Sequence, residues 1–220
     1  MATATKKKKK SNNNFFKFIK WFWVLFFIGV LSVAMVFLLA SWGAFGAMPE
    51  YERLENPQTN LASEIISSDG ETLGKFYLDD NRTDVAYEEL PKTLVQALVA
   101  TEDARYYEHS GIDARGTLRA FVYLGKKGGA STISQQLARQ LFVGVRSKNI
   151  FETITQKIKE WVLAIRLERS YTKEEIVKMY LNIYDFNYNA DGIRSASRIY
   201  FGKEPKNLKI EESAVLVGML

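Results

Sequence analysis

Two neighbouring carboxylates, Glu102 and Asp103, stand where a helix-patterned segment ends, and the only histidine of the chain, His109, follows them. A carboxylate at the end of an apolar helix is suited to acid or base catalysis, because partial burial lets it hold a proton near neutral pH. An ordinary solvated surface is the alternative, since most acidic residues lie in water. The pair therefore predicts a proton-transfer site only together with further residues of the chain.

A second candidate carboxylate, Glu160, lies in the middle of segment 150–169, which has the apolar spacing of a long helix. At about 100° per residue, Glu160 falls opposite the main apolar face but still among apolar residues. This pattern predicts a helix that is buried nearly all round. A buried carboxylate requires a partner or a function, so we expect either a structural ion pair with a Lys or Arg, or a catalytic role. The apolar residues are Ile154, Ile158, Trp161, Val162 and Ile165 on the main face, and Leu163, Ala164 and Leu167 around Glu160.

A basic, glycine-rich loop at residues 126–130 precedes Ser131, which we expect to cap a further helix. The N-terminus of a helix binds anions through its free backbone N–H groups. The loop is therefore a candidate cradle for a phosphate, and an ordinary basic surface turn is the alternative. We interpret His109 as a structural, hydrogen-bonded residue, because a lone histidine is poor evidence for a metal site.

The elements that must position these residues are predicted to be mainly α-helical, with a small β element near the start of the domain. Asp69 and Gly70 suit the turn of a hairpin within segment 64–77, between β-branched and aromatic residues. Helices are expected from Pro91 to the carboxylate pair, from the N-cap Asp113 to Gly125, at 131–141 and at 150–169. Three more are expected: from the capping box Thr172–Glu175 through Tyr180, at 192–200 before Gly202, and at 211–220. A polar loop is expected at 182–189.

The N-terminal region is predicted to anchor the chain in a membrane. Residues 21–42 are uncharged and almost wholly apolar, about the length that a helix needs to cross a bilayer. Seven lysines precede this segment, which places a basic tail, residues 1–20, in the cytoplasm. The chain after a linker at 43–62 is then on the extracytoplasmic side. A cleaved signal peptide is the alternative, disfavoured because the apolar run is longer than that of a signal peptide.

The net charge of +5 comes from this tail. Residues 1–42 hold seven of the 30 basic residues and no acidic one, so the remaining 23 basic residues are balanced by 25 acidic residues. This balance argues against a nucleic-acid partner for the folded part. The absence of cysteine excludes disulfides and thiolate chemistry.

Five motifs, in the expected order, resemble those of the peptidoglycan glycosyltransferases of glycosyltransferase family 51. This family comprises the polymerase domain of class A penicillin-binding proteins and the monofunctional enzymes. The motifs are Ala-Thr-Glu-Asp-x-x-Tyr-Tyr-Glu-His-x-Gly at 100–111, Gly-Ala-Ser-Thr-Ile-Ser-Gln-Gln at 129–136, Lys157-Ile-Lys-Glu160 with Leu167-Glu168, Tyr180-Leu-Asn182 with Gly192-Ile193, and the start of a fifth at 214–220. The likeness extends from about Ser63 to Leu220, which predicts a glycosyltransferase domain at 63–220.

The resemblance implies a lysozyme-like α domain with a membrane-embedded jaw subdomain. The substrates would be lipid II and the growing lipid-linked glycan, and the product strand would form with inversion at C1 and release of undecaprenyl pyrophosphate. Glu102 matches the catalytic base that takes the proton from the 4-hydroxyl of the acceptor. Glu160 matches a second essential carboxylate, which acts at the pyrophosphate directly or through a divalent metal, Mg²⁺ or Mn²⁺. The matching substrate-binding positions are Asp103, His109, Gly129, Ser131, Thr132, Gln136, Arg139 and Lys157.

The family also implies a location in the bacterial plasma membrane, contact with membrane lipid, and other cell-wall synthesis proteins as partners. Three residues depart from its usual pattern: Tyr106 replaces Phe, Arg139 replaces Lys and Gln156 replaces Arg. The change at Gln156 removes a cation from the site of the leaving group. The chain also ends within the fifth motif, so we expect the domain to be incomplete at its C-terminus.

Two other functions remain open at this point. A scaffold protein built on the same fold would bind lipid II without turnover, and Gln156 and the short C-terminus favour it. A lysozyme-like hydrolase would use two carboxylates to cut glycan strands, but the membrane anchor and the second motif argue against it.

Overall fold

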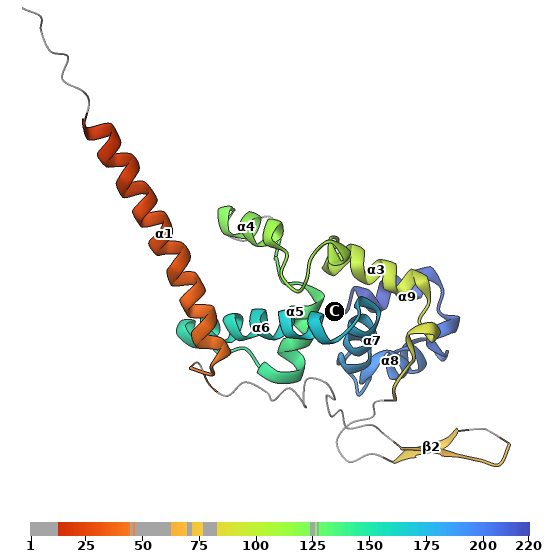
Figure 1. Cartoon of the computed structure of the whole chain (residues 1–220). Coiled ribbons are helices and arrows are strands. Elements are labelled where there is room, and N and C mark those ends of the chain that lie inside the picture. The colour runs from red at the N-terminus through yellow and green to blue at the C-terminus, as the bar shows by residue number, and fades with distance from the viewer. Residues whose placement is uncertain are drawn as a thin grey trace, which may run out of the picture. The chain divides into compact units, whose positions relative to one another are not determined.

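The computed structural model describes residues 13–44, 46, 63–69, 72–76, 83–123, 126 and 128–220. Figure 1 shows the chain coloured from red at its N-terminus to blue at its C-terminus. It divides into two compact units, Met1–Gly46 and Ala47–Leu220. Much of the predicted basic tail and most of the predicted linker lie outside the described residues.

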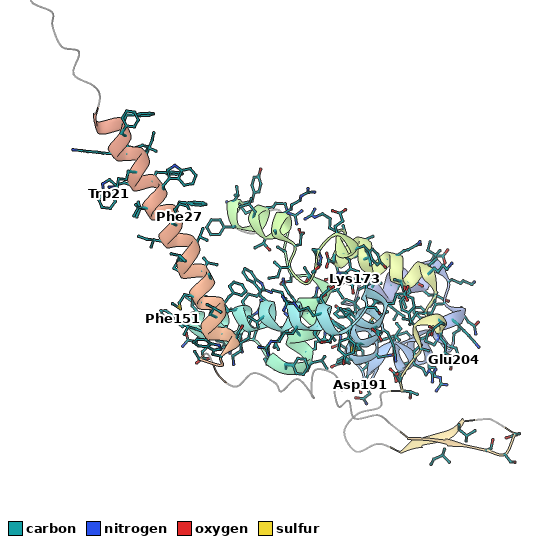
Figure 2. All side chains as sticks on the ribbon, in the orientation of Figure 1. Trp21, Phe27, Phe151, Lys173, Asp191 and Glu204 are labelled. Carbon is teal, nitrogen blue, oxygen red and sulfur yellow. The ribbon has the colours of Figure 1, made fainter. Side chains whose placement is uncertain are left out.

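The first unit contains one long helix, α1 (Asn13–Ser41). Its stretch Phe15–Ser41 is 27 residues long and apolar enough to cross a membrane, and at 1.5 Å per residue it spans about 40 Å. Large apolar side chains such as Trp21 and Phe27 project from the helix into the surroundings (Figure 2). The helix predicted at 21–42 is confirmed as far as Ser41, and it begins earlier, at Asn13, so that it includes Lys17 and Lys20.

The second unit begins with an antiparallel hairpin of β1 (Ser63–Ile66) and β2 (Thr72–Phe76). Ser63 pairs with Phe76 and Ile66 with Thr72, with an irregularity between Ile65 and Ile66. This confirms the predicted β element. Gly70, which we expected in the turn, lies outside the described residues.

The rest of the described second unit is mainly α-helical, as the sequence predicted. Its elements are the 3₁₀ turn η1 (Tyr87–Glu89), α3 (Lys92–Glu102), the 3₁₀ turn η2 (Tyr106–Glu108), α4 (Ala114–Val122), α5 (Ile133–Ala138), the π-helical turn η3 (Arg139–Val143), α6 (Ile150–Ser170), α7 (Lys173–Ile183), α8 (Gly192–Phe201), the 3₁₀ turn η4 (Pro205–Asn207) and α9 (Ile210–Val217). The predicted capping box opens α7, and Gly202 ends α8 in the left-handed conformation, which glycine adopts without strain.

The short helix α5 lies at the centre of this unit, packed against α6 and α7, while α3 packs against α9 (Figure 1). All but one residue of α5 are buried. The largest fully buried side chains of this unit include Tyr106, Tyr180 and Phe186. A buried central helix is a rigid support, because close-packed side chains cannot move without disturbing their neighbours. Residues at both ends of α5 are therefore held in fixed positions.

Three local predictions need correction. Thr132, and not Ser131, caps α5: its hydroxyl accepts the N–H of Gln135. Two adjacent hydroxyl residues suit a cap equally well, so the pattern could not choose between them. Asn182 belongs to the last turn of α7 and not to the following loop. The prediction that α6 is buried nearly all round is wrong for its first turns, where Ile150 and Phe151 are exposed.

Candidate active site

The carboxylate Glu102 ends α3, as predicted, and lines a cavity of about 410 Å³. The walls of this cavity come from the end of α3, the loop before α4, α4 itself, and residues 128–132 with Gln136 of α5. The cavity therefore gathers the first and second motifs, which lie about 30 residues apart in the sequence. Predicted site residues that line it are Glu102, Asp103, Gly129, Ser131, Thr132 and Gln136.

Glu102 is held by one hydrogen bond. Its Oε2 atom accepts a hydrogen bond from Nε2 of Gln136 over 2.7 Å, and Oε1 of Gln136 accepts a hydrogen bond from the hydroxyl of Tyr180 over 2.9 Å. Among the residues that the structure describes, the second oxygen of Glu102 has no hydrogen-bond partner. A half-buried carboxylate with one oxygen fixed and one unoccupied can accept a proton from a bound molecule.

Asp103, next to Glu102, is buried and fully engaged by the protein. Both of its carboxylate oxygens lie 3.0 Å from Nε2 of His109, and one also accepts the backbone N–H of Ile133 over 3.2 Å. These bonds join the end of α3 to the beginning of α5. Asp103 and His109 thus fix the backbone next to Glu102, which agrees with the interpretation of His109 as a hydrogen-bonded residue.

The loop after His109 is docked on α5 and α6 through Gly111. The carbonyl of Gly111 accepts bonds from the hydroxyl of Thr132 (2.8 Å) and the amide of Gln135 (3.1 Å). Gly111 has φ +92°, and a Cβ atom at this position would lie 2.9 Å from the backbone of Ala164 in α6. Only glycine allows this approach. Thr132 therefore caps α5 and holds the first motif at the same time.

A buried ionic network supports the same loop from the other side. Nζ of Lys173, at the start of α7 (Figure 2), donates to the carbonyl of His109 and to Glu168, both over 2.7 Å. Glu168 also accepts the hydroxyl of Ser134 in α5 over 2.5 Å. The first motif is thus connected to α5, α6 and α7, so the position of Glu102 depends on the whole helical core.

The second predicted carboxylate, Glu160, has the ion-pair partner that its burial requires. Glu160 is 3% exposed, and Nζ of Lys157 lies 2.6 Å from its Oε2 atom. The same ammonium group donates to Oγ of Ser131 over 2.9 Å. Because Ser131 lines the cavity, Lys157 connects the buried carboxylate to the cavity wall.

Glu160 was the candidate ligand for a metal ion. No group of three or more His, Cys, Asp or Glu side chains that could hold a metal ion occurs within the described ranges. Among the described residues, the contacts of Lys157 join Glu160 to Ser131 and to no second carboxylate, and Glu160 is already paired with the ammonium group of Lys157. A divalent cation would find one protein carboxylate there and would need its other ligands from bound phosphate and water.

A family model described as Transglycosylase matches residues 69–220. The chain belongs to the transglycosylase family. Penicillin-binding protein 1A of Escherichia coli (strain K12) is 36% identical over 214 residues, covering 92% of this chain and 24% of that protein. Penicillin-binding protein 1F of Bacillus subtilis (strain 168) is 41% identical over 165 residues, with coverages of 73% and 22%. Penicillin-binding protein 1A of Vibrio cholerae is 38% identical over 176 residues, with coverages of 78% and 21%.

These matches confirm the family predicted from the five motifs, the transglycosylase domain of class A penicillin-binding proteins. The chain spans less than a quarter of the length of each of these three relatives. The helical fold agrees with the lysozyme-like domain expected for this family. The roles of individual residues in this transglycosylase stay predictions.

Two arginines of this transglycosylase line the cavity and were not predicted as site residues. Arg119 of α4 donates to the carbonyl of Gly129 over 3.2 Å, and Arg105 forms an ion pair with Asp113 at the cavity wall. Burial acts to raise the pKa of Asp113, but hydrogen bonds, the one from Arg105 foremost, outweigh it and lower that pKa. No local sequence pattern indicates these two arginines, because each bond joins residues that are eight or ten positions apart.

Two of the three departures from the family pattern, Arg139 and Gln156, have different surroundings. Arg139 begins η3, and its positive charge, like the negative charge of Glu102, acts on the hydroxyls of Tyr180 and Tyr184. Gln156 binds the backbone of the loop before α6: it accepts the N–H of Ser147 (3.0 Å) and donates to the carbonyl of Val145 (3.1 Å). Gln156 therefore stabilises the conformation of the loop before α6.

Proposed function

We propose that this chain is a peptidoglycan glycosyltransferase that polymerises lipid II into glycan strands, with inversion at C1 and release of undecaprenyl pyrophosphate. Family membership supports the reaction class. The observation that carries the proposal is Glu102, whose carboxylate lines the cavity with one oxygen held by Gln136 and the other unoccupied among the described residues.

In this mechanism Glu102 takes the proton from the 4-hydroxyl of the acceptor lipid II. The oxygen attacks C1 of the growing strand while the bond from C1 to the pyrophosphate breaks, and the electron pair leaves with the pyrophosphate. Inversion requires the base and the leaving group to lie on opposite sides of C1. A bond network that fixes Glu102 contributes to the rate, because proton transfer requires a defined donor–acceptor distance.

The leaving pyrophosphate gains negative charge, which nearby cations stabilise. Lys157 is the candidate that the contacts favour, since its ammonium group is bonded to Ser131 at the cavity wall. Glu160 orients Lys157 through the 2.6 Å ion pair. The prediction of Mg²⁺ or Mn²⁺ at Glu160 is kept as part of the proposal: an ion bound there together with the pyrophosphate would offset the same charge.

We also propose that the protein is anchored in the bacterial plasma membrane by α1, with the N-terminus in the cytoplasm and the catalytic domain on the extracytoplasmic side. Exposed apolar side chains on α4 (Leu118, Phe121) and at the start of α6 (Ile150, Phe151) suit contact with membrane lipid. Such contact would bring the cavity to the surface where lipid II lies. Other cell-wall synthesis proteins remain expected partners.

The second candidate function, a scaffold that binds lipid II without turnover, is favoured by Gln156. Its amide is bonded to the backbone of residues 145 and 147 and supplies no cation to a leaving group. The two functions differ in one measurable outcome, namely whether glycan strands form.

The experiment is a polymerisation assay with labelled lipid II and the purified full chain in detergent, with and without divalent metal. The expected result is high-molecular-weight glycan that disappears in Glu102→Gln, while the variant keeps its melting temperature. Binding of lipid II without any product would establish the scaffold function. Release of reducing ends from finished peptidoglycan would point to the hydrolase.

A further inference from the structure

A chain of two hydrogen bonds connects Glu102 to a residue outside the cavity. Gln136 lies between Glu102, which ends α3, and Tyr180 of α7, and uses both ends of its amide. Tyr180 is fully buried and does not line the cavity. The bond from Tyr180 to Gln136 therefore reaches the active site from inside the core.

The carboxylate of Glu102 sets the donor and acceptor directions of these two hydrogen bonds. An ionised carboxylate only accepts hydrogen bonds, so Gln136 must present its NH₂ group to Glu102 and its carbonyl oxygen to the opposite side. The terminal amide of a glutamine has two nearly equivalent orientations about its last torsion. With the reversed amide, its carbonyl oxygen would face Glu102, and two acceptors would repel each other. A donor on the far side of Gln136, bonded to the carbonyl oxygen, strengthens this preference and limits rotation of the amide.

Tyr180 is such a donor. Its ring is enclosed by the core and lies 5.7 Å from the ring of Tyr184, so the hydroxyl cannot swing away from Gln136. Burial, followed by the negative charge of Glu102, raises the pKa of Tyr180. The hydroxyl therefore keeps its proton at physiological pH and remains available to the amide carbonyl.

We propose that Tyr180 is a positioning residue for the proton-transfer step: it fixes the amide of Gln136, and Gln136 holds one oxygen of Glu102 so that the other can receive the proton of the acceptor hydroxyl. This inference rests on the proposed role of Glu102 as the base. Tyr180 itself contacts neither reacting atom. Loss of its hydroxyl lets the amide rotate and Glu102 move, which lowers turnover without changing how lipid II binds.

The test is a cycle of Tyr180→Phe, Gln136→Ala and the double variant in the full chain, with steady-state kinetics on labelled lipid II. Tyr106→Phe is the matched control, because Tyr106 is equally buried and donates over the same 2.9 Å, but to the backbone carbonyl of Lys173. We expect Tyr180→Phe to lower kcat about tenfold with KM unchanged, the size of one lost hydrogen bond. Tyr106→Phe should stay within about twofold of the original rate.

The decisive comparison is the effect of Tyr180→Phe in the Gln136→Ala background. If Tyr180 acts through Gln136, Tyr180→Phe has no further effect on kcat once Gln136 is replaced by Ala. An equal loss in both backgrounds, or an equal loss in Tyr106→Phe, would overturn the proposal. If the unaltered chain makes no glycan, the proposed function fails first. In that case, the melting temperatures of Tyr180→Phe, Gln136→Ala and the double variant test the hydrogen bond between Tyr180 and Gln136. If the two single shifts in melting temperature add up to the shift of the double variant, that bond is refuted.

Discussion

Lys157 and Glu160 form an ion pair of 2.6 Å across one turn of α6, and the ammonium group of Lys157 also bonds to Ser131 at the cavity wall. The carboxylate is almost completely buried, whereas 29% of the Lys157 side chain is exposed. Removing a carboxylate from water is unfavourable, and the attraction of a well-placed cation offsets this penalty. The cation is therefore required for stability as long as the buried carboxylate is present, whether or not the pair also has a role at the leaving group.

Substitutions in this pair separate the two roles. Lys157→Met leaves Glu160 buried without a cation, and we expect it to reduce the free energy of unfolding by about 3 kcal/mol. Adding Glu160→Leu removes the unpaired charge and should restore most of the stability. Thermal unfolding of the full chain in detergent measures both effects. We expect the restored double variant to be inactive, so glycan synthesis by it would show that the pair is structural only.

Gly111 offers a test of how the first motif is docked. A Cβ atom there would clash with the backbone of Ala164, and the residue has φ +92°. We expect Gly111→Ala to lower the free energy of unfolding by at least about 2 kcal/mol, because both the contact and the conformation become unfavourable. The control is Gly129→Ala, since a Cβ at Gly129 meets nothing within 4 Å. Equal stability of the two variants would contradict this account of the loop.

Much of the framework follows from short-range patterns. The capping box Thr172–Glu175 and the terminal Gly202 were predicted because each needs only residues within one turn of a helix. The burial of Glu160 followed from helical periodicity alone. The bond from Tyr180 to Gln136 joins residues 44 positions apart, and no local pattern specifies such a contact. The exposure of Phe151 was missed because periodicity identifies an apolar face but does not tell what covers it.

The ion pair of Arg105 and Asp113 predicts a pH dependence of stability. The pKa of Asp113 is lowered in the folded chain, so the pair stabilises the fold above the pKa of an unfolded aspartate, about 4. This contribution is lost as the pH falls through the lowered pKa. Because both side chains are partly exposed, at 30% and 15%, we expect this contribution to be small.

Asp113→Asn is the variant that checks this dependence. It should be less stable than the original chain at neutral pH, and the difference in melting temperature should shrink as the pH is lowered below about 4. A difference that stays constant down to about pH 3 would show that Asp113 stabilises the fold through packing or neutral hydrogen bonds and not through its charge.

Gln156→Arg tests whether the missing cation at this position limits glycan synthesis. Gln156 makes two bonds to the loop before α6, at Val145 and Ser147, and an arginine cannot accept the N–H of Ser147. We expect amide hydrogen exchange at residues 144–148 to become about tenfold faster or more, with no gain in polymerisation. Thr155→Ala is the control, because its hydroxyl bonds only to Glu152 within the same helix. If Gln156→Arg instead raised glycan synthesis tenfold, a missing cation would limit turnover in this chain, and the account of Gln156 as a residue that only holds the loop would be wrong.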